Sequence, residues 1–355
     1  MQGRKKWIFN IVFLFLVIGL TMYGLFHGSD LGDLKELISQ ADPRWWALAF
    51  LLVVAFILGE SLVLHDIMRT LRTPHRLPHC FLYSFIGFFF SCITPSAGGG
   101  QPAQVYFMRK DGIDPAVSVP VMILVTITYK LVLVLFALGV LILRPRAILT
   151  ALTPVWGWCI LGIVLNAGFI GLYILLVVCP GAVERFLGWA IRHPGKLLGT
   201  KKVEKMLNWL EKWMNQYRDA SKVMRTRPWM LLRVTLLTVL QRCLLFAVTF
   251  CALRSFGILT GSLPVVVTLQ AMISLGTDLL PLPGGMGASE TMFMRIFPAV
   301  CGEAMTLPTL VVSRGISYYG QLLISAVFTA VAVFVIGQHR KPHLPPEKHR
   351  EEERK

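Results

Sequence analysis

The chain has 355 residues, of which 55% are hydrophobic and only 15% are charged, and its formal net charge is +16. A soluble domain usually carries about 25% charged residues, so this composition excludes an ordinary soluble enzyme. Several uninterrupted apolar runs exceed the length of about 18 residues that can cross a bilayer. The composition therefore predicts an all-α integral membrane protein.

The basic residues cluster in the segments between the apolar runs. Lysine and arginine enrichment in cytoplasmic loops, together with attraction to anionic lipid, explains this better than binding to nucleic acid. The seven cysteines are scattered and lack CxxC or metal-ligand spacing. No GxSxG, P-loop or HExxH motif is present. We therefore expect no metal, no cofactor and no catalytic residue in this chain.

Six apolar runs are long enough to span a membrane. The first follows a basic cluster at residues 4–6 and lacks a small-residue cleavage site, so we interpret it as a signal anchor. Two shorter runs, 79–94 and 263–280, lead directly into a repeated motif. The six long runs lie at about 7–27, 44–65, 116–143, 155–179, 229–254 and 306–337.

The repeated motif is the most informative feature of the chain. The stretch Pro95–Arg109 (PSAGGGQPAQVYFMR) returns 186 residues later as Pro281–Arg295 (PLPGGMGASETMFMR), with six of fifteen positions identical. Proline and glycine break a helix at the start of each copy. A membrane protein built from two such broken units is typical of secondary transporters.

The distribution of basic residues predicts how the two units are oriented. Segment 181–227 carries eleven Lys or Arg against four acidic residues, so it should be cytoplasmic. It reaches that side if 79–108 and 263–297 enter the membrane and return on the same side. This gives six spanning helices plus two re-entrant hairpins, with both termini in the cytoplasm. Units 43–143 and 228–337 then form an inverted repeat in the cell membrane.

An alternative is that the duplication serves packing alone. Irregular backbone inside a membrane must be buried in protein or line a wet cavity, because lipid cannot bond its N–H and C=O groups. We favour the wet cavity. The helices that follow the breaks would begin with unpaired N–H groups, which favour anions such as phosphate. The glycines expected to supply these donors are Gly98, Gly99, Gly100, Gly284, Gly285 and Gly287.

Charged residues inside the apolar runs are the other candidates for a binding site. Aligning Pro120 with Pro308 places Arg314 opposite Thr126, with Lys130 one turn further on the same face. A cation in hydrocarbon is costly and usually faces a pathway or a partner. A structural ion pair between Glu290 and Arg314 is the alternative reading. The predicted substrate-binding side chains are Gln104, Lys130, Arg242, Glu290, Arg295 and Arg314, with Glu60 and Asp278 as further candidate partners of the cations.

Two segments outside the spans have different expected roles. Within 181–227, residues 200–227 place apolar residues on one helical face, which fits an interfacial helix on anionic lipid, a helix packed on the bundle, or a docking site for a soluble partner. The charged tail 341–355 has too few apolar residues to fold. The sequence leaves open whether the chain forms a homo-oligomer.

The second hairpin and the last span carry a family resemblance. The sequence PLPGGMGASE, followed by an apolar helix containing SRGISYY, resembles the lysylphosphatidylglycerol synthase transmembrane-domain family. This family includes the membrane half of the bacterial multiple peptide resistance factors. The resemblance covers about residues 5–340 and implies a flippase-like transmembrane domain over 1–340. In the full-length factors a soluble C-terminal domain makes the lipid, and this chain has only a short tail after its last span, so the resemblance implies transport rather than synthesis.

The sequence therefore predicts a lipid translocator that moves an anionic or aminoacylated phospholipid, such as lysylphosphatidylglycerol, or another lipid-linked anion between leaflets. One alternative is the membrane component of a lipid-modifying transferase, either of the phosphatidylglycerol lysyltransferase type that the family name implies or for lipid-linked glycosyl transfer, with its catalytic domain on another chain. A scaffold without transport activity is a third reading.

Overall fold

The computed structural model describes residues 31–73, 76–94, 97–192, 226–280 and 282–337, together with scattered positions between 207 and 222. The predicted first span at 7–27, most of the amphipathic segment 200–227 and the tail 341–355 lie outside the described residues. The described elements are helical, in agreement with the predicted all-α class. In chain order they are α2 (Leu31–Ser39), α3 (Pro43–Thr70), α4 (Leu77–Ile93), α5 (Gly100–Lys110), α6 (Pro115–Leu143), α7 (Arg146–Leu152), η2 (Thr153–Val155), α8 (Trp156–Val178), α9 (Pro180–Arg192), α12 (Pro228–Ser255), α13 (Leu263–Thr277), η3 (Pro283–Gly285), α14 (Ala288–Ile296), α15 (Pro298–Arg314), η4 (Gly315–Gly320) and α16 (Gln321–Gly337).

Five helical runs are long and apolar enough to cross a membrane, and they confirm the five predicted spans within the described residues. Two of them begin earlier than predicted. The run expected at 155–179 begins at Arg146 because α7 and η2 continue into α8. The run expected at 306–337 begins at Pro298, where Gly302, with φ of 74°, interrupts the regular helix. Glu303 and Pro308 make that region less apolar, so the sequence pattern placed the start of the span at residue 306 rather than at Pro298.

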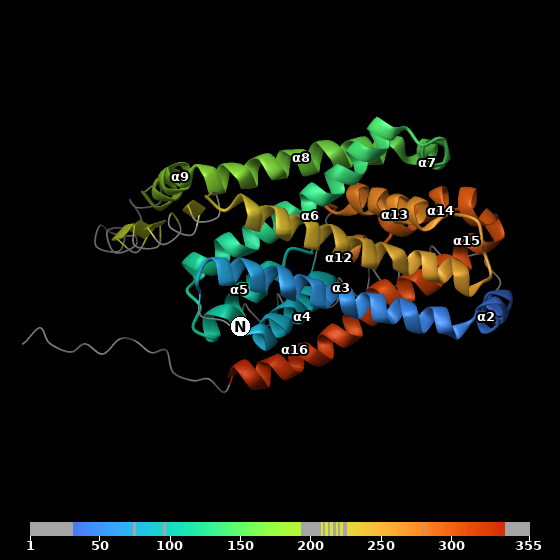
Figure 1. The fold of residues 1–355 in the computed structure, drawn as a ribbon, viewed down its shortest axis with the longest axis horizontal. Coiled ribbons are helices and arrows are strands. Elements are labelled where there is room, and N and C mark those ends of the chain that lie inside the picture. The colour runs from blue at the N-terminus through green and yellow to red at the C-terminus, as the bar shows by residue number, and fades with distance from the viewer. Residues whose placement is uncertain are drawn as a thin grey trace, which may run out of the picture.

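The two short apolar helices form the predicted hairpins. We call α4, the following turn and α5 hairpin one, and α13, the following turn and α14 hairpin two. Hairpin one starts and finishes at the end of the bundle where α9 and the last turn of α16 lie, which we call the α9 end (Figure 1). Hairpin two starts and finishes at the opposite end, near α2 and α7. The two hairpins therefore enter from opposite ends, as an inverted repeat requires.

The same sequence signal starts the long helix on either side of hairpin one. Asp42 caps α3 by accepting a hydrogen bond from the Arg44 N–H at 2.9 Å, and Pro43 occupies the first helical position. Asp114 caps α6 in the same way, accepting from the Ala116 N–H at 2.9 Å. An aspartate followed by proline satisfies a free N–H and fixes the backbone for a helix. These caps set where α3 and α6, the long helices that precede and follow hairpin one, begin.

The first helices of the two units, α3 and α12, pack along each other through the middle of the bundle (Figure 1). The Gln241 side-chain amide donates to the Phe56 carbonyl at 3.1 Å. The outer faces of α8 and α16 are apolar and exposed, as lipid contact requires. Their exposed side chains include Ile160, Val164, Leu172, Leu323, Val327 and Phe334.

Hairpin one is closely packed where α5 begins, which gives a first prediction. A Cβ added at Gly100 would lie 2.1 Å from the Ser91 hydroxyl and 2.6 Å from the Gly87 carbonyl oxygen. Gly100→Ala should therefore lower the free energy of unfolding by about 1–3 kcal/mol. Thermal unfolding in detergent measures the change in Tm. Gly139→Ala in α6 is the matched control, because its Cβ would meet nothing within 4 Å. An equal Tm for the two variants would contradict this packing.

Candidate functional site

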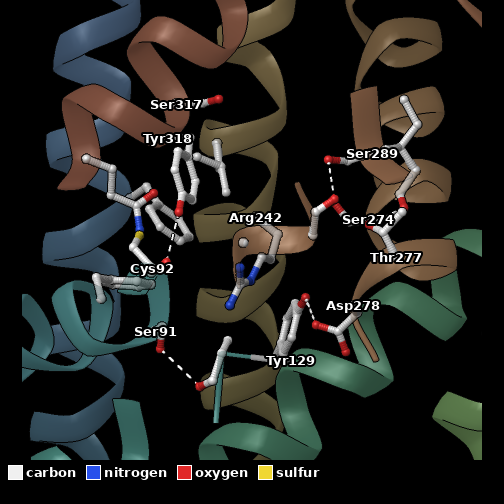
Figure 2. Close-up of a pocket in the computed structure, with 18 of the residues that line it drawn as sticks. Ser91, Cys92, Tyr129, Arg242, Ser274, Thr277, Asp278, Ser289, Ser317 and Tyr318 are labelled. Carbon is white, nitrogen blue, oxygen red and sulfur yellow. Dashed lines mark hydrogen bonds between the residues drawn. The ribbon is translucent and has the colours of Figure 1, made fainter. Parts of the chain in front are cut away.

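A cavity of about 500 Å³ lies where the two hairpins meet inside the bundle. Cavities of roughly 300–1,000 Å³ are typical of small-molecule sites. The turns and helices of both hairpins line it, together with α3, α6, α8, α12, α15, η4 and the first residue of α16 (Figure 2). It is therefore placed where an inverted-repeat transporter holds its substrate.

Each hairpin turn is closed by a side chain from its own hairpin. In hairpin one, the Thr94 hydroxyl accepts from the Gly99 N–H at 2.9 Å. In hairpin two, the Glu290 carboxylate accepts from the Gly287 N–H at 2.6 Å, and Gly284, Gly285 and Gly287 all have positive φ. Glycine adopts that conformation without a steric cost. Two of the N–H groups expected to bind an anion are therefore already bonded within the protein.

Lys130 lies at the centre of a buried polar cluster. Its Nζ is 2.6 Å from Oδ2 of Asp278, which follows the last residue of α13. The Tyr129 hydroxyl donates to Oδ1 of the same carboxylate at 2.6 Å. Asn166 of α8 accepts from Lys130 at 3.4 Å and donates to the Leu275 carbonyl at 3.3 Å. Lys130 of unit one is thus neutralised by a carboxylate of hairpin two.

Arg314 forms the second buried ion pair. Its Nε lies 2.7 Å from Oε1 of Glu290, and it also donates to the Ser289 hydroxyl. The ion pair considered from the sequence is therefore present. The next residues form the π-helical turn η4, where the Tyr318 hydroxyl donates to the Cys92 carbonyl of hairpin one at 2.8 Å. Such wide turns occur often at functional sites.

Arg242 is the cation of the cavity that no described carboxylate contacts directly, and Glu60 interacts with it only through their charges. Among the described residues it forms no ion pair, and its buried Nε has no hydrogen-bond partner. The guanidinium lies 3.7 Å from the ring centroid of Tyr129 and 5.1 Å from that of Phe56. Figure 2 shows Arg242 extending into the middle of the cavity. Glu60, on the same wall, instead accepts from the Gln104 amide at 2.8 Å.

The structure brings most of the predicted site residues to this cavity. Glu290 lies behind Arg314, while Gly99, Gly100 and Gly287 form the turns without lining the cavity. Arg295 is exposed and does not line the cavity. It follows Glu290 by five residues, which is roughly 140° around a helix, so the two side chains point to different sides of α14. Predicted residues that line the cavity are Gly98, Gln104, Lys130, Arg242, Gly284, Gly285 and Arg314.

Other polar residues in the cavity, and Asn166 beside it, were missed in the sequence. Tyr129 bonds Asp278 and stacks on Arg242, and Gln101 donates to Thr126 at 2.7 Å. Asn166 is the only amide side chain in α8. A polar residue inside an otherwise apolar span is a signal of a buried polar contact, so Asn166 could have been found from the sequence.

Comparisons with known proteins agree with this architecture. The family model described as the lysylphosphatidylglycerol synthase TM region matches residues 7–325. The chain is also 22% identical over 338 residues to a UPF0104 membrane protein of Methanothermobacter thermautotrophicus, covering 90% of this chain and 92% of that protein. The family match extends over both hairpins and all of the residues that line the cavity. The chain therefore belongs to the family of the lysylphosphatidylglycerol synthase TM region.

Proposed function

We propose that this protein is a lipid translocator that moves an anionic or aminoacylated phospholipid, such as lysylphosphatidylglycerol, between the leaflets of the cytoplasmic membrane. The observation that carries this proposal is the charged cavity at the meeting point of the two hairpins, inside a bundle whose outer faces are apolar. A cation inside a membrane bundle that forms no direct ion pair is costly. An anionic headgroup at Arg242 would offset that cost.

The cavity offers a cation for the phosphate of a lipid headgroup. Arg242 would bind the phosphate, whereas the Glu290 carboxylate lies behind Arg314, outside the cavity lining, and would position that arginine. The acyl chains would remain outside the bundle, against apolar faces such as that of α8. Because the hairpins belong to different units and enter from opposite ends, modest rocking of one unit against the other would switch access to the cavity.

Leaflet exchange in proteoliposomes tests this function. Fluorescent phosphatidylglycerol and lysylphosphatidylglycerol are reconstituted with the full chain, and a membrane-impermeant reductant then reports the fraction of label in the outer leaflet. We expect more label to become reducible than in protein-free vesicles, with phosphatidylcholine as the lipid that tests selectivity. Failure to exchange either anionic or aminoacylated lipid would contradict the proposal.

We also propose that the α9 end faces the cytoplasm, because the basic residues of the 71–76 and 109–114 loops and of α9 lie at that end. Cys179 is exposed between α8 and α9. An impermeant maleimide should label it in inverted membrane vesicles and not in intact cells. Labelling in intact cells alone would reverse the orientation.

A second candidate role follows from the family description, which names a synthase. In that role the protein would present lipid to a transferase domain on another chain. The exposed aromatic pair Phe186 and Trp189 on α9 offers a surface for such a domain. Loss of a copurifying transferase activity on replacing both aromatic residues, with leaflet exchange absent in the wild type, would favour this role over translocation.

A further inference from the structure

The carboxylate of Asp278 is held as a bound oxyanion would be. One of its oxygens accepts from the Lys130 ammonium at 2.6 Å and the other accepts from the Tyr129 hydroxyl at 2.6 Å. Both donors lie on α6 of unit one, whereas Asp278 comes from hairpin two. Figure 2 shows the bond between Tyr129 and Asp278. A cation and a hydroxyl, one for each oxygen, are also a suitable pair of donors for a phosphate group.

The surrounding contacts keep these donors in place whether or not Asp278 is present. Asn166 holds the Lys130 Nζ from α8, and Arg242 lies against the Tyr129 ring at 3.7 Å. Lys130, Tyr129 and Arg242 all line the same cavity. A phosphate bound at Arg242 therefore has the two α6 donors beside it.

We propose that Tyr129 and Lys130 form an oxyanion subsite for a phosphate group, and that Asp278 is an internal carboxylate that occupies this subsite until the phosphate displaces it. The inference rests on the proposed function and names the group of the lipid that the cavity recognises. It also assigns Asp278 a role in regulation. Asp278 competes with the substrate and is not a ligand for it.

Displacement of Asp278 would change how the two units are joined. Its hydrogen bonds tie hairpin two to α6 of unit one. The ion pair between Glu290 and Arg314 lies within unit two and would move with hairpin two. A ligand shifts a conformational equilibrium by its difference in affinity for the two states. Phosphate binding would thus remove the charged tie between hairpin two and α6 of unit one while leaving the Glu290–Arg314 ion pair of unit two intact.

Binding of soluble phosphates to the full chain in phosphatidylcholine nanodiscs tests the competition. The probes are inorganic phosphate and glycerol 1-phosphate, measured by calorimetry. Asp278→Asn should bind both about tenfold more tightly than wild type, since the competing charge is removed. Glu60→Gln is the matched control, because it removes another cavity carboxylate that bonds Gln104 rather than α6. Equal gains for the two variants would overturn the proposal, because they would reflect net charge alone.

A second pair of variants keeps the test decisive if Asp278→Asn fails to fold. Tyr129→Phe removes one donor but retains the ring beneath Arg242 and the ion pair of Lys130. We expect its glycerol phosphate affinity to fall about fivefold, as loss of one hydrogen bond to a charged group implies. Tyr173→Phe alters another tyrosine of the cavity wall that makes no hydrogen bond to Asp278 in the described structure, and it should bind as wild type does. Wild-type affinity in Tyr129→Phe would exclude the subsite.

The same discs identify the source of the phosphate and separate this inference from the transport proposal. If phosphatidylglycerol in the discs competes with glycerol phosphate, the subsite binds the phosphate of a lipid headgroup. If it does not compete, the ligand is a soluble phosphate, and the lipid-binding form of the inference is wrong. Tighter binding by Asp278→Asn without any leaflet exchange would remove the transport function and keep the subsite. Leaflet exchange by wild type, with equal phosphate affinities in Asp278→Asn and Glu60→Gln, would keep the transport function and remove the subsite.

Discussion

Arg242→Gln should slow leaflet exchange of phosphatidylglycerol about ten- to a hundredfold, while changing the free energy of unfolding by no more than about 1 kcal/mol. The rate falls because a hydrogen bond between a guanidinium and a phosphate contributes about 1.5–3 kcal/mol. Stability changes little because the substitution breaks no ion pair among the described residues, and the nearby Glu60 carboxylate keeps its hydrogen bond from Gln104. The exchange assay gives the rate, and denaturant titration in mixed micelles gives the stability.

Arg254→Gln is the control for that experiment. Arg254 lies on the same helix and also stacks on an aromatic ring, that of Phe250, at 4.4 Å. Its guanidinium bonds the Ile258 and Gly261 carbonyls at the end of α12, outside the cavity. Exchange by this variant should stay within about twofold of wild type, because surface hydrogen bonds away from a site have small effects. Equal rates for Arg242→Gln and wild type would place the anion elsewhere.

The choice of Arg242 over Arg314 illustrates what the sequence could and could not show. Lys130 and Arg314 stood out as substrate-binding residues because they are cations in corresponding spans of the two units, with Lys130 one turn beyond the position aligned with Arg314. Both turn out to be neutralised, by Asp278 and Glu290. Replacing Arg314 would leave the Glu290 carboxylate unpaired, so stability and substrate binding would change together. Replacing Arg242 breaks no ion pair among the described residues, so its effect on binding can be measured separately.

The hairpins were predictable because their signal is local. Proline and glycine interrupt an apolar run twice at matched positions, and those residues cannot continue a helix whatever surrounds them. The equivalence of Thr126 and Arg314 also holds in the structure. Gln101 of hairpin one bonds Thr126, and Ser289 of hairpin two bonds Arg314. Each hairpin is tied to the next long helix of its own unit at the aligned position.

The pairing of Lys130 with Asp278 was not predictable, because it joins residues 148 positions apart on different units. It depends on the rotation of α6 about its axis and on the depth that hairpin two reaches in the bundle. The spacing of residues in the sequence determines neither of these, because both are set by close packing between helices. At Gly162 of α8, an added Cβ would lie 2.4 Å from the Leu275 carbonyl oxygen, so α8 and α13 are in near-backbone contact there. That approach brings Asn166 to Lys130.

Lys130→Met should lower the free energy of unfolding by about 3–5 kcal/mol, because it leaves the Asp278 carboxylate buried without its cation. Asp278 is only 13% exposed and Lys130 only 7%. Arg233→Met is the matched control, because it breaks the ion pair with Asp66 in which the arginine is 58% exposed. Exposed pairs contribute about 0–1 kcal/mol, so that variant should unfold close to wild type.

The double variant Lys130→Met/Asp278→Asn distinguishes loss of the pair from loss of packing. It removes both charges and keeps an acceptor for the Tyr129 hydroxyl, so most of the stability lost in Lys130→Met should return. Denaturant titration of wild type, Lys130→Met, Asp278→Asn and the double variant closes a double-mutant cycle, and the coupling between the two positions should exceed about 2 kcal/mol. Additive losses would mean that the lysine contributes through its alkyl chain alone. In that case Asp278 would not be the carboxylate that closes the α6 subsite, and the tie between the two units would have to lie elsewhere.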